Sequence, residues 1–282
     1  MSELCERARR AALRGRAKAE SLISGEYPLR VAGLGLEYID LREYTLGDDF
    51  RRIDWRASAR TGLEKLFVRE YSAERRVQLA YIVDLTSSMS FKRKPEALAY
   101  TLALHARISE ALRDEVMLVV LADKVQVLSS RRPMVAVEHV LRIICNCNMR
   151  GSLDLGDALW TIVSYARGLP LAVYTDYANN RESFKRIALT ARASGKSVRF
   201  FIMVSPGEKA ISKESWELPL FETESGSKAL LSLAEFATYV RRHIASLRSA
   251  LPQHAIVEVV AHGGTPALMS LVASYMDLRN NL

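Results

Sequence analysis

The chain has 282 residues, of which 49% are hydrophobic and 26% are charged. This composition is typical of a globular protein with a sizeable core, and it excludes collagen-like, low-complexity and wholly disordered chains. The formal net charge of +8 makes an anionic partner worth testing, so the distribution of that charge matters more than its sum.

The N-terminal region predicts a cytoplasmic protein. Met1–Arg16 is rich in arginine and lacks the apolar run of a secretory signal. The best apolar stretches, Val77–Val83 and Ile256–Ala261, are strand-length and far short of the ~18 residues of a membrane span. Of the three cysteines, Cys145 and Cys147 are too close in sequence to join distant segments. We interpret the cysteines as small buried apolar residues in a reducing compartment.

Residues 3–24 have the composition and apolar spacing of a helix. Basic residues are dense there, with six between Arg7 and Lys18 and no acidic residue. Between Arg42 and Arg76, eight arginines are matched by seven acidic residues, which favours an ion-pair network over a track for phosphates. Nucleic-acid binding is therefore kept only as a minor alternative.

The segment from Gly33 to Tyr71 is predicted to be irregular and partly stranded. After Arg76 the pattern changes to alternating strands and helices, which indicates a doubly wound, mostly parallel sheet with helices on both faces. We therefore predict an N-terminal region at 1–76 and an α/β domain at 77–282. Gly207–Ser227 is the longest predicted loop. The predicted strands are Val77–Val83, Val116–Leu121, Val125–Leu128, Leu171–Tyr174, Val198–Val204 and Ala255–Val260, and the predicted helices are Lys94–Leu112, Val135–Cys145, Leu155–Ala166, Asn180–Ala193, Ala229–Ala250 and Pro266–Leu278.

Oxygen-bearing side chains follow the first strand of this sheet. Asp84, Thr86 and Ser88 stand at alternate positions on the loop, and Asp176 follows a second strand. Carboxylates and hydroxyls are hard ligands of the kind that Mg²⁺ prefers. Spacing alone is equally consistent with a helix cap or turn that needs no ion.

Asp84-x-Thr86-x-Ser88 resembles the Asp-x-Ser-x-Ser metal-ion-dependent adhesion site of the von Willebrand factor A fold. Leu41–Arg60 resembles the segment that characterises the prokaryotic family called domain of unknown function 58, in which an A-like domain follows. The resemblance covers about residues 33–176. It implies a von Willebrand factor A-like domain here.

In the A fold, a Thr from a second loop and an Asp from a third complete the ion site. Asp176 matches the third loop, whereas Leu153 stands where the Thr of the second loop is expected. Ser152, Asp154 or water could replace that ligand, or nothing does. Bound Mg²⁺ is thus an open expectation of the resemblance.

The family segment combines arginines, carboxylates and one indole, which pair and stack well with one another. We interpret it as a structural clamp that fastens the N-terminal region to the A-like domain, in preference to a ligand or partner site. Its candidate residues are Arg42, Tyr44, Gly47, Asp48, Arg51, Arg52, Asp54, Trp55 and Arg60.

The favoured function is a non-enzymatic protein-interaction module. The family resemblance implies a MoxR-type AAA+ ATPase as partner, together with a client complex that the pair assembles or activates. An alternative is a Mg²⁺-dependent phosphohydrolase of haloacid-dehalogenase type, which also places an Asp after its first strand. That class needs a second Asp as general acid and base where this chain has Thr86, so the enzyme is disfavoured.

Overall fold

The structure is a computed structural model, and it describes most of the chain. The described residues are 2–24, 38–45, 48, 53–61, 64–71, 76–146, 149, 151–209, 217–221, 228–260 and 265–280. No helix among these ranges is long and apolar enough to cross a membrane.

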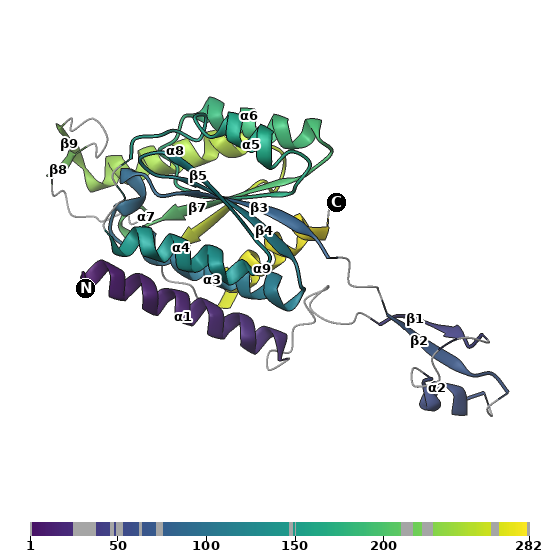
Figure 1. Ribbon diagram of the computed structural model, residues 1–282. Helices are drawn as coiled ribbons and strands as arrows, with labels where there is room; N and C mark the ends of the chain where they lie inside the picture. The colour runs from purple at the N-terminus through teal and green to yellow at the C-terminus, as the bar shows by residue number, and fades with distance from the viewer. Residues whose placement is uncertain are drawn as a thin grey trace.

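A six-stranded sheet forms the centre of the molecule (Figure 1). Its strand order is β10-β7-β6-β3-β4-β5, and every neighbouring pair is parallel except β4 and β5. The strands are β3 (Gln78–Asp84), β4 (Glu115–Leu121), β5 (Val125–Ser130), β6 (Leu171–Thr175), β7 (Val198–Val204) and β10 (Ile256–Val260). The predicted doubly wound α/β fold is confirmed.

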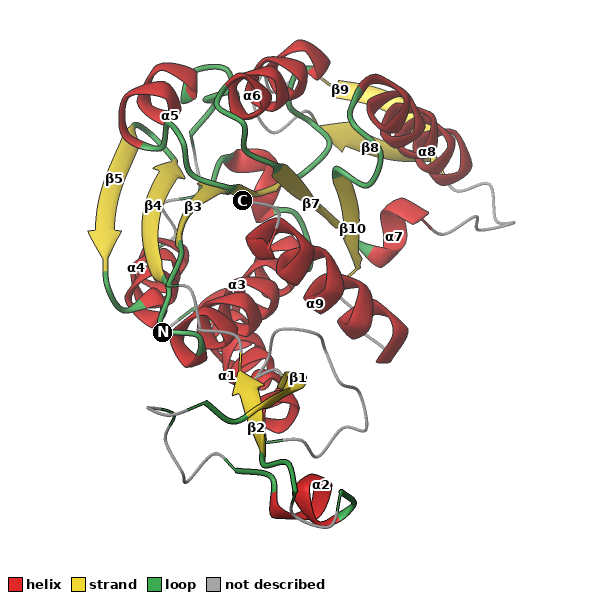
Figure 2. Ribbon diagram, turned by 90° about the vertical axis from the view of Figure 1, so that its right-hand side faces the viewer, coloured by secondary structure: helices red, strands yellow, loops and turns green. Residues whose placement is uncertain are grey.

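Helices cover both faces of the sheet, and each face has its own apolar core (Figure 2). One layer contains α3 (Lys94–Ala111), α4 (Pro133–Cys145) and α9 (Thr265–Asn280), and the other contains α5 (Leu159–Tyr165), α6 (Arg181–Ala193) and α8 (Leu233–Ala250). In β3, Leu79, Tyr81 and Val83 point into the first core, whereas Ala80 and Ile82 point into the second. Burial on both faces explains why β3 is a continuous apolar run.

The N-terminal helix α1 (Glu3–Ile23) packs against α3 and α4. Its contact face is made of alanines around Gly15, where a Cβ would lie 2.2 Å from the carbonyl oxygen of Tyr100. Glycine therefore allows the two helices to approach closely. The predicted boundary at residue 76 falls just before β3, although α1 packs with helices of the second region.

A disulfide joins Cys5 of α1 to Cys145 at the end of α4. Our interpretation of the cysteines as unlinked apolar residues was wrong for this pair. Sequence separation hides this pair, because Cys5 lies 140 residues from Cys145 and becomes its neighbour only through the packing of α1 against α4. Cys147 lies outside the described residues.

Two smaller units accompany the sheet. β1 (Tyr38–Glu43) and β2 (Phe67–Tyr71) form an antiparallel pair beside the short helix α2 (Trp55–Ala59), apart from the main sheet in Figure 1. After β7, the short helix α7 (Pro206–Lys209) precedes the hairpin β8 (Glu217–Phe221) and β9 (Lys228–Ser232).

The second of these units corrects the predicted loop at Gly207–Ser227 and the predicted helix start at Ala229. The leucines of β8 alternate with other residue types over too few positions to be recognised as a strand. Residues 229–232 pair as β9 with β8, so α8 begins only at Leu233.

Candidate functional site

The sheet reverses its order between β3 and β6. From β3 the chain adds β4 and β5 on one side, and it then returns to add β6, β7 and β10 on the other side. In open α/β sheets, ligands bind in the crevice at the carboxyl ends of the strands at such a switch point. Asp84 ends β3 and Asp176 directly follows β6, so both predicted acids lie there.

The first loop turns its oxygens toward Asp84. The Thr86 hydroxyl and backbone N–H both donate to Asp84 Oδ1, at 2.6 and 2.9 Å. Thr86 Oγ1 lies 3.4 Å from Ser88 Oγ. Thr86 is also the N-cap residue of the 3-10 helix η2 (Ser87–Ser90), but its side chain makes no capping bond to that helix. The hydroxyl is therefore directed at the carboxylate.

The third loop reaches the same carboxylate from the other side of the switch point. Thr175 Oγ1 and Asn179 Nδ2 donate to Asp84 Oδ2, at 2.7 and 2.9 Å. Asp176 lies between these two residues in sequence, and its Oδ1 accepts from the backbone N–H of Ala178. Asp84 and Asp176 are both fully buried. The structure thus brings the predicted first-loop and third-loop residues together.

The second loop enters at Gly151. Gly151 forms a parallel bridge with Thr86, and its carbonyl accepts from Ser87 N at 2.9 Å. A Cβ at Gly151 would lie 2.0 Å from the carbonyl oxygen of Ala122, so only glycine fits this close approach.

The proposed substitutes for the missing threonine lie just beyond Gly151. Asp154 accepts hydrogen bonds from Gly156 N, Asn180 N and the Ser183 hydroxyl, so its carboxylate is engaged at the start of α6. Ser152 is exposed, and Leu153 is half-buried.

A buried ion-pair network adjoins Asp176, and sequence reasoning missed it. Lys94, at the start of α3, places Nζ 2.8 Å from Asp176 Oδ2 and 3.0 Å from Glu208 Oε1 of α7. Glu208 also accepts from the Tyr177 hydroxyl at 2.6 Å and from Ser205 N at 2.7 Å. Lys94 is only 3% exposed. In sequence it belongs to the run Lys92–Lys94, which we did not single out as part of a site.

Burial and neighbouring charges shift the pKa values of Asp84 and Lys94 for different reasons. Burial raises the pKa of Asp84, the charge of Asp176 raises it further, and the hydrogen bonds from Thr86 and Thr175 act against this rise. For Lys94, burial favours the neutral amine, but the carboxylates of Asp176 and Glu208 outweigh burial, and the pKa of Lys94 is raised. Lys94 is therefore held as an ammonium ion.

The donor set suits a divalent cation in its chemistry. Thr86 Oγ1 lies 2.6 Å from Asp84 Oδ1 and 3.4 Å from Ser88 Oγ. Neighbouring ligand oxygens in an octahedral Mg²⁺ site are about 3.0 Å apart, which lies between these two distances. Among the described residues, no cluster of three or more His, Cys, Asp or Glu side chains has metal-binding geometry. An ion here would therefore need hydroxyls and water beside the two carboxylates.

The described part of the arginine-rich segment includes hydrogen bonds between its own residues. Asp48 accepts from the backbone N–H and the hydroxyl of Thr45, and Asp54 caps α2 through Arg56 N and Ala57 N. Trp55 is 59% exposed. Tyr44 is half-buried and Arg60 exposed. Gly47, Arg51, Arg52 and the side chain of Arg42 lie outside the described residues. The clamp stays a prediction.

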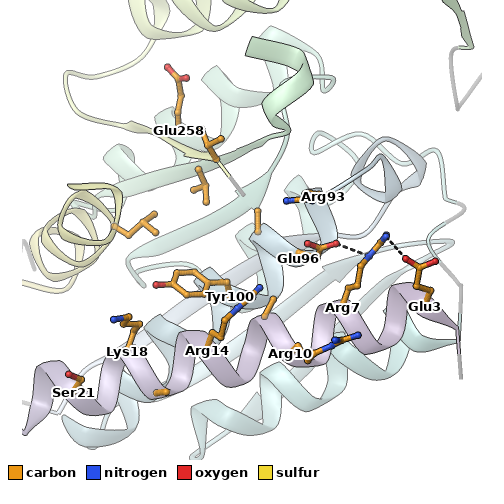
Figure 3. Close-up of a pocket in the computed structure, with 16 residues that line it drawn as sticks. Glu3, Arg7, Arg10, Arg14, Lys18, Ser21, Arg93, Glu96, Tyr100 and Glu258 are labelled. Carbon is orange, nitrogen blue, oxygen red and sulfur yellow. Dashed lines mark hydrogen bonds and ion pairs between the residues drawn. The ribbon is translucent and has the colours of Figure 1, made fainter. Parts of the chain in front are cut away.

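A cavity of about 960 Å³ lies between α1, α3, β10 and α9, and it holds none of the predicted metal or clamp residues (Figure 3). Its basic side chains are Arg7, Arg10, Arg14, Lys18 and Arg93, and its acidic ones are Glu3, Glu96 and Glu258. Arg7 pairs with Glu3 and Glu96, at 2.9 and 2.8 Å, and Arg10 pairs with Glu6 at 3.3 Å. The mixture of charges weakens the nucleic-acid alternative.

The family described as "Protein of unknown function DUF58" matches residues 40–195, which is more than half of the chain. The chain belongs to this family. Uncharacterized proteins of Mycobacterium bovis and of two Mycobacterium tuberculosis strains are 34% identical to it over 74 residues. That alignment covers 26% of this chain and only 23% of each relative.

Two solved structures are similar over most of their length. They are a conserved hypothetical protein, BatB, of Bacteroides thetaiotaomicron and an aerotolerance-related membrane protein of Bacteroides fragilis carrying multiple mutations to serine. The first is 17% identical with a TM-score of 0.42, over 72% of this chain and 98% of that one. The second is 14% identical with a TM-score of 0.43, over 73% and 100%. Likeness at this level carries no argument about function.

Proposed function

We propose that this protein is a non-enzymatic interaction module of von Willebrand factor A type, which binds its partner at the carboxyl edge of β3 and β6. The observation that supports this most directly is the convergence of Asp84, Thr86, Ser88 and Asp176 at the switch point of the sheet. Thr86, where a phosphohydrolase needs an acid, donates its hydroxyl to Asp84 and cannot act as a general acid near neutral pH.

A divalent cation, Mg²⁺ by its ligand chemistry, is part of the proposal. Two buried carboxylates, Asp176 and Glu208, face the ammonium of Lys94, and the buried carboxylate of Asp84 interacts electrostatically with Asp176, so these four residues together carry an excess of negative charge. Such an excess is costly in a protein interior unless a cation offsets it. A bound ion would supply an open coordination position for an acidic side chain of the partner. Asp84, Asp176 and the two hydroxyls would hold it.

The partner that we propose is a MoxR-type AAA+ ATPase, with a client complex that the two proteins assemble or activate together. This part rests on the family resemblance of Leu41–Arg60 and of the Asp84 loop. Because the chain aligns with less than a quarter of its curated relatives, their properties do not bear on the choice of partner.

Recovery of the ATPase on immobilised protein tests the proposal. Asp84→Asn removes one buried charge while keeping the shape of the side chain, so we expect the variant to remain folded and to recover about tenfold less ATPase. Asp123→Asn is the matched control, because Asp123 is exposed at the same edge of the sheet just after β4. Equal recovery by wild type and Asp84→Asn would contradict the proposed binding face.

A further inference from the structure

Lys94 occupies a position that is unfavourable for a cation in two respects. It is almost completely buried, and it is the first residue of α3, where the helix dipole presents partial positive charge. Arg93, the preceding N-cap residue, makes no side-chain capping bond to α3. The carboxylates of Asp176 and Glu208 therefore account for the ammonium in this position.

Asp176 and Glu208 both contact the Lys94 ammonium, but they differ in their other hydrogen bonds. Glu208 accepts from two further donors, the Tyr177 hydroxyl and Ser205 N, whereas the Asp176 carboxylate accepts from one further donor among the described residues, Ala178 N. The aromatic ring of Tyr177 also lies under Lys94 Nζ, 4.7 Å from its centroid. Glu208 and Tyr177 thus provide contacts that would still stabilise the ammonium if it no longer contacted Asp176.

We propose that Lys94 is a built-in counter-ion that competes with a divalent cation for Asp176 and so weakens the affinity of the site for that cation. The inference rests on the proposed function, because it concerns the same third-loop carboxylate. Lys94 must release Asp176 Oδ2 and keep Glu208 before that oxygen becomes available to another cation. Lys94 is thus a positioning residue for Asp176, and its charge tunes the site.

The decisive variant is the double substitution Lys94→Gln and Glu208→Gln. It removes one positive and one negative charge, so the net charge of the four-residue network does not change, and glutamine preserves much of the length and hydrogen bonding at both positions. In this double variant, the ammonium of Lys94 no longer contacts Asp176. We expect Mn²⁺, titrated by calorimetry and by electron paramagnetic resonance, to bind this variant about tenfold or more tighter than wild type.

Glu208→Gln alone provides an independent readout if the double variant does not fold. It leaves Lys94 paired with Asp176 alone, so the ammonium should hold that carboxylate more firmly, and Mn²⁺ should bind about threefold or more weaker than to wild type. Circular dichroism and thermal unfolding establish that each variant compared is folded. Unchanged Mn²⁺ affinity in folded Glu208→Gln would overturn the proposal.

The remaining outcomes separate this inference from the proposed function. If wild type and the double variant bind Mn²⁺ equally tightly, Lys94 does not compete, and the ion of the proposed function stands without it. If neither binds Mn²⁺, the inference falls, while recovery of the ATPase still decides the binding face. Weaker binding by the folded double variant would show that Lys94 supports the ion, which is the opposite of our proposal.

Discussion

His105 is a neutral base enclosed by aromatic rings on the face of the sheet that carries α3. Its ring stacks on Tyr275 at a centroid distance of 4.3 Å, and Nδ1 lies 3.0 Å from the hydroxyl of Tyr174. The side chain is fully buried, and burial lowers its pKa from 6.5 to about 3. Folding therefore requires an uncharged imidazole at this point.

This shift predicts a loss of stability in acid. The unfolded chain binds a proton at His105 near pH 6.5, whereas the folded protein binds it only near pH 3. The contribution is fully present above pH 6.5 and is lost as the pH falls toward 3, which amounts to about 2–3 kcal/mol between pH 7 and 4.5. Urea unfolding at both pH values, for wild type and His105→Phe, measures the difference.

His105→Phe should lack this part of the pH dependence, because phenylalanine does not titrate. The raised pKa of Asp84 acts in the opposite direction, since a folded carboxyl that holds its proton more tightly gains stability in acid. Asp84 is present in both chains, so its effect cancels in the comparison. Parallel pH profiles for the two chains would contradict the assignment to His105.

Single residues of the site differ in how readily the sequence reveals them. Asp84, Thr86 and Asp176 follow apolar strands, so local pattern was sufficient to place them at one edge of the sheet. Lys94 follows no such rule, and Glu208, although it stands shortly after the apolar strand β7, joins the site only because α3 and α7 meet at that edge. Asn179 had a weak signal, since it stands three residues after Asp176 on the same loop.

The disulfide acts at the level of elements, because it joins α1 to the end of α4. The covalent bond thus fastens the N-terminal helix to the end of α4. It also closes a long segment of chain, 140 residues in sequence separation.

We expect Cys5→Ser to lower the free energy of unfolding by about 2–5 kcal/mol, because the unfolded chain gains the entropy that the cross-link removes. Denaturant unfolding under non-reducing conditions measures the loss. Treatment of wild type with a reductant should give the same loss, and it should have no effect on Cys5→Ser. A reductant effect of equal size in both proteins would mean that the Cys5–Cys145 bond is not its source.

Most elements followed from periodicity, and the exceptions have physical reasons. The central strands β3, β6 and β7 are buried on both faces, so each is an apolar run that stands out from its flanks. The helix predicted at Leu155–Ala166 is confirmed only from Leu159, because Asp154 and Asp157 form a turn before it. The hairpin of β8 and β9 is short, and pairing rather than local pattern defines it.

At the scale of the whole molecule, strand order is what creates the candidate site. The sequence predicted a parallel sheet with covering helices, but the positions of the strands within it came only from the structure. Composition and periodicity also carry no information on the partner. The proposed ATPase rests on the family segment near residues 41–60, which the structure describes only in part.

The distribution of charge over the molecule bears on the remaining alternative, nucleic-acid binding. The net charge is +8, yet Arg7, Arg10 and Arg16 of α1 are all paired with glutamates, and carboxylates line the basic cavity. Phosphate backbones bind to clustered, uncompensated cations, and their affinity falls steeply with salt. We therefore expect no retention of mixed DNA or RNA in gel-shift assays, even at low ionic strength.

The same assay identifies the source of any binding that does occur. Arg14 is exposed on α1 and lines the cavity, whereas Arg167 is exposed after α5 on the opposite face of the sheet. Arg14→Glu and Arg167→Glu change the charge equally, so binding by dispersed charge should fall equally in both variants. Tight binding that only Arg14→Glu abolishes would make α1 a nucleic-acid surface and would overturn our preference for a protein partner.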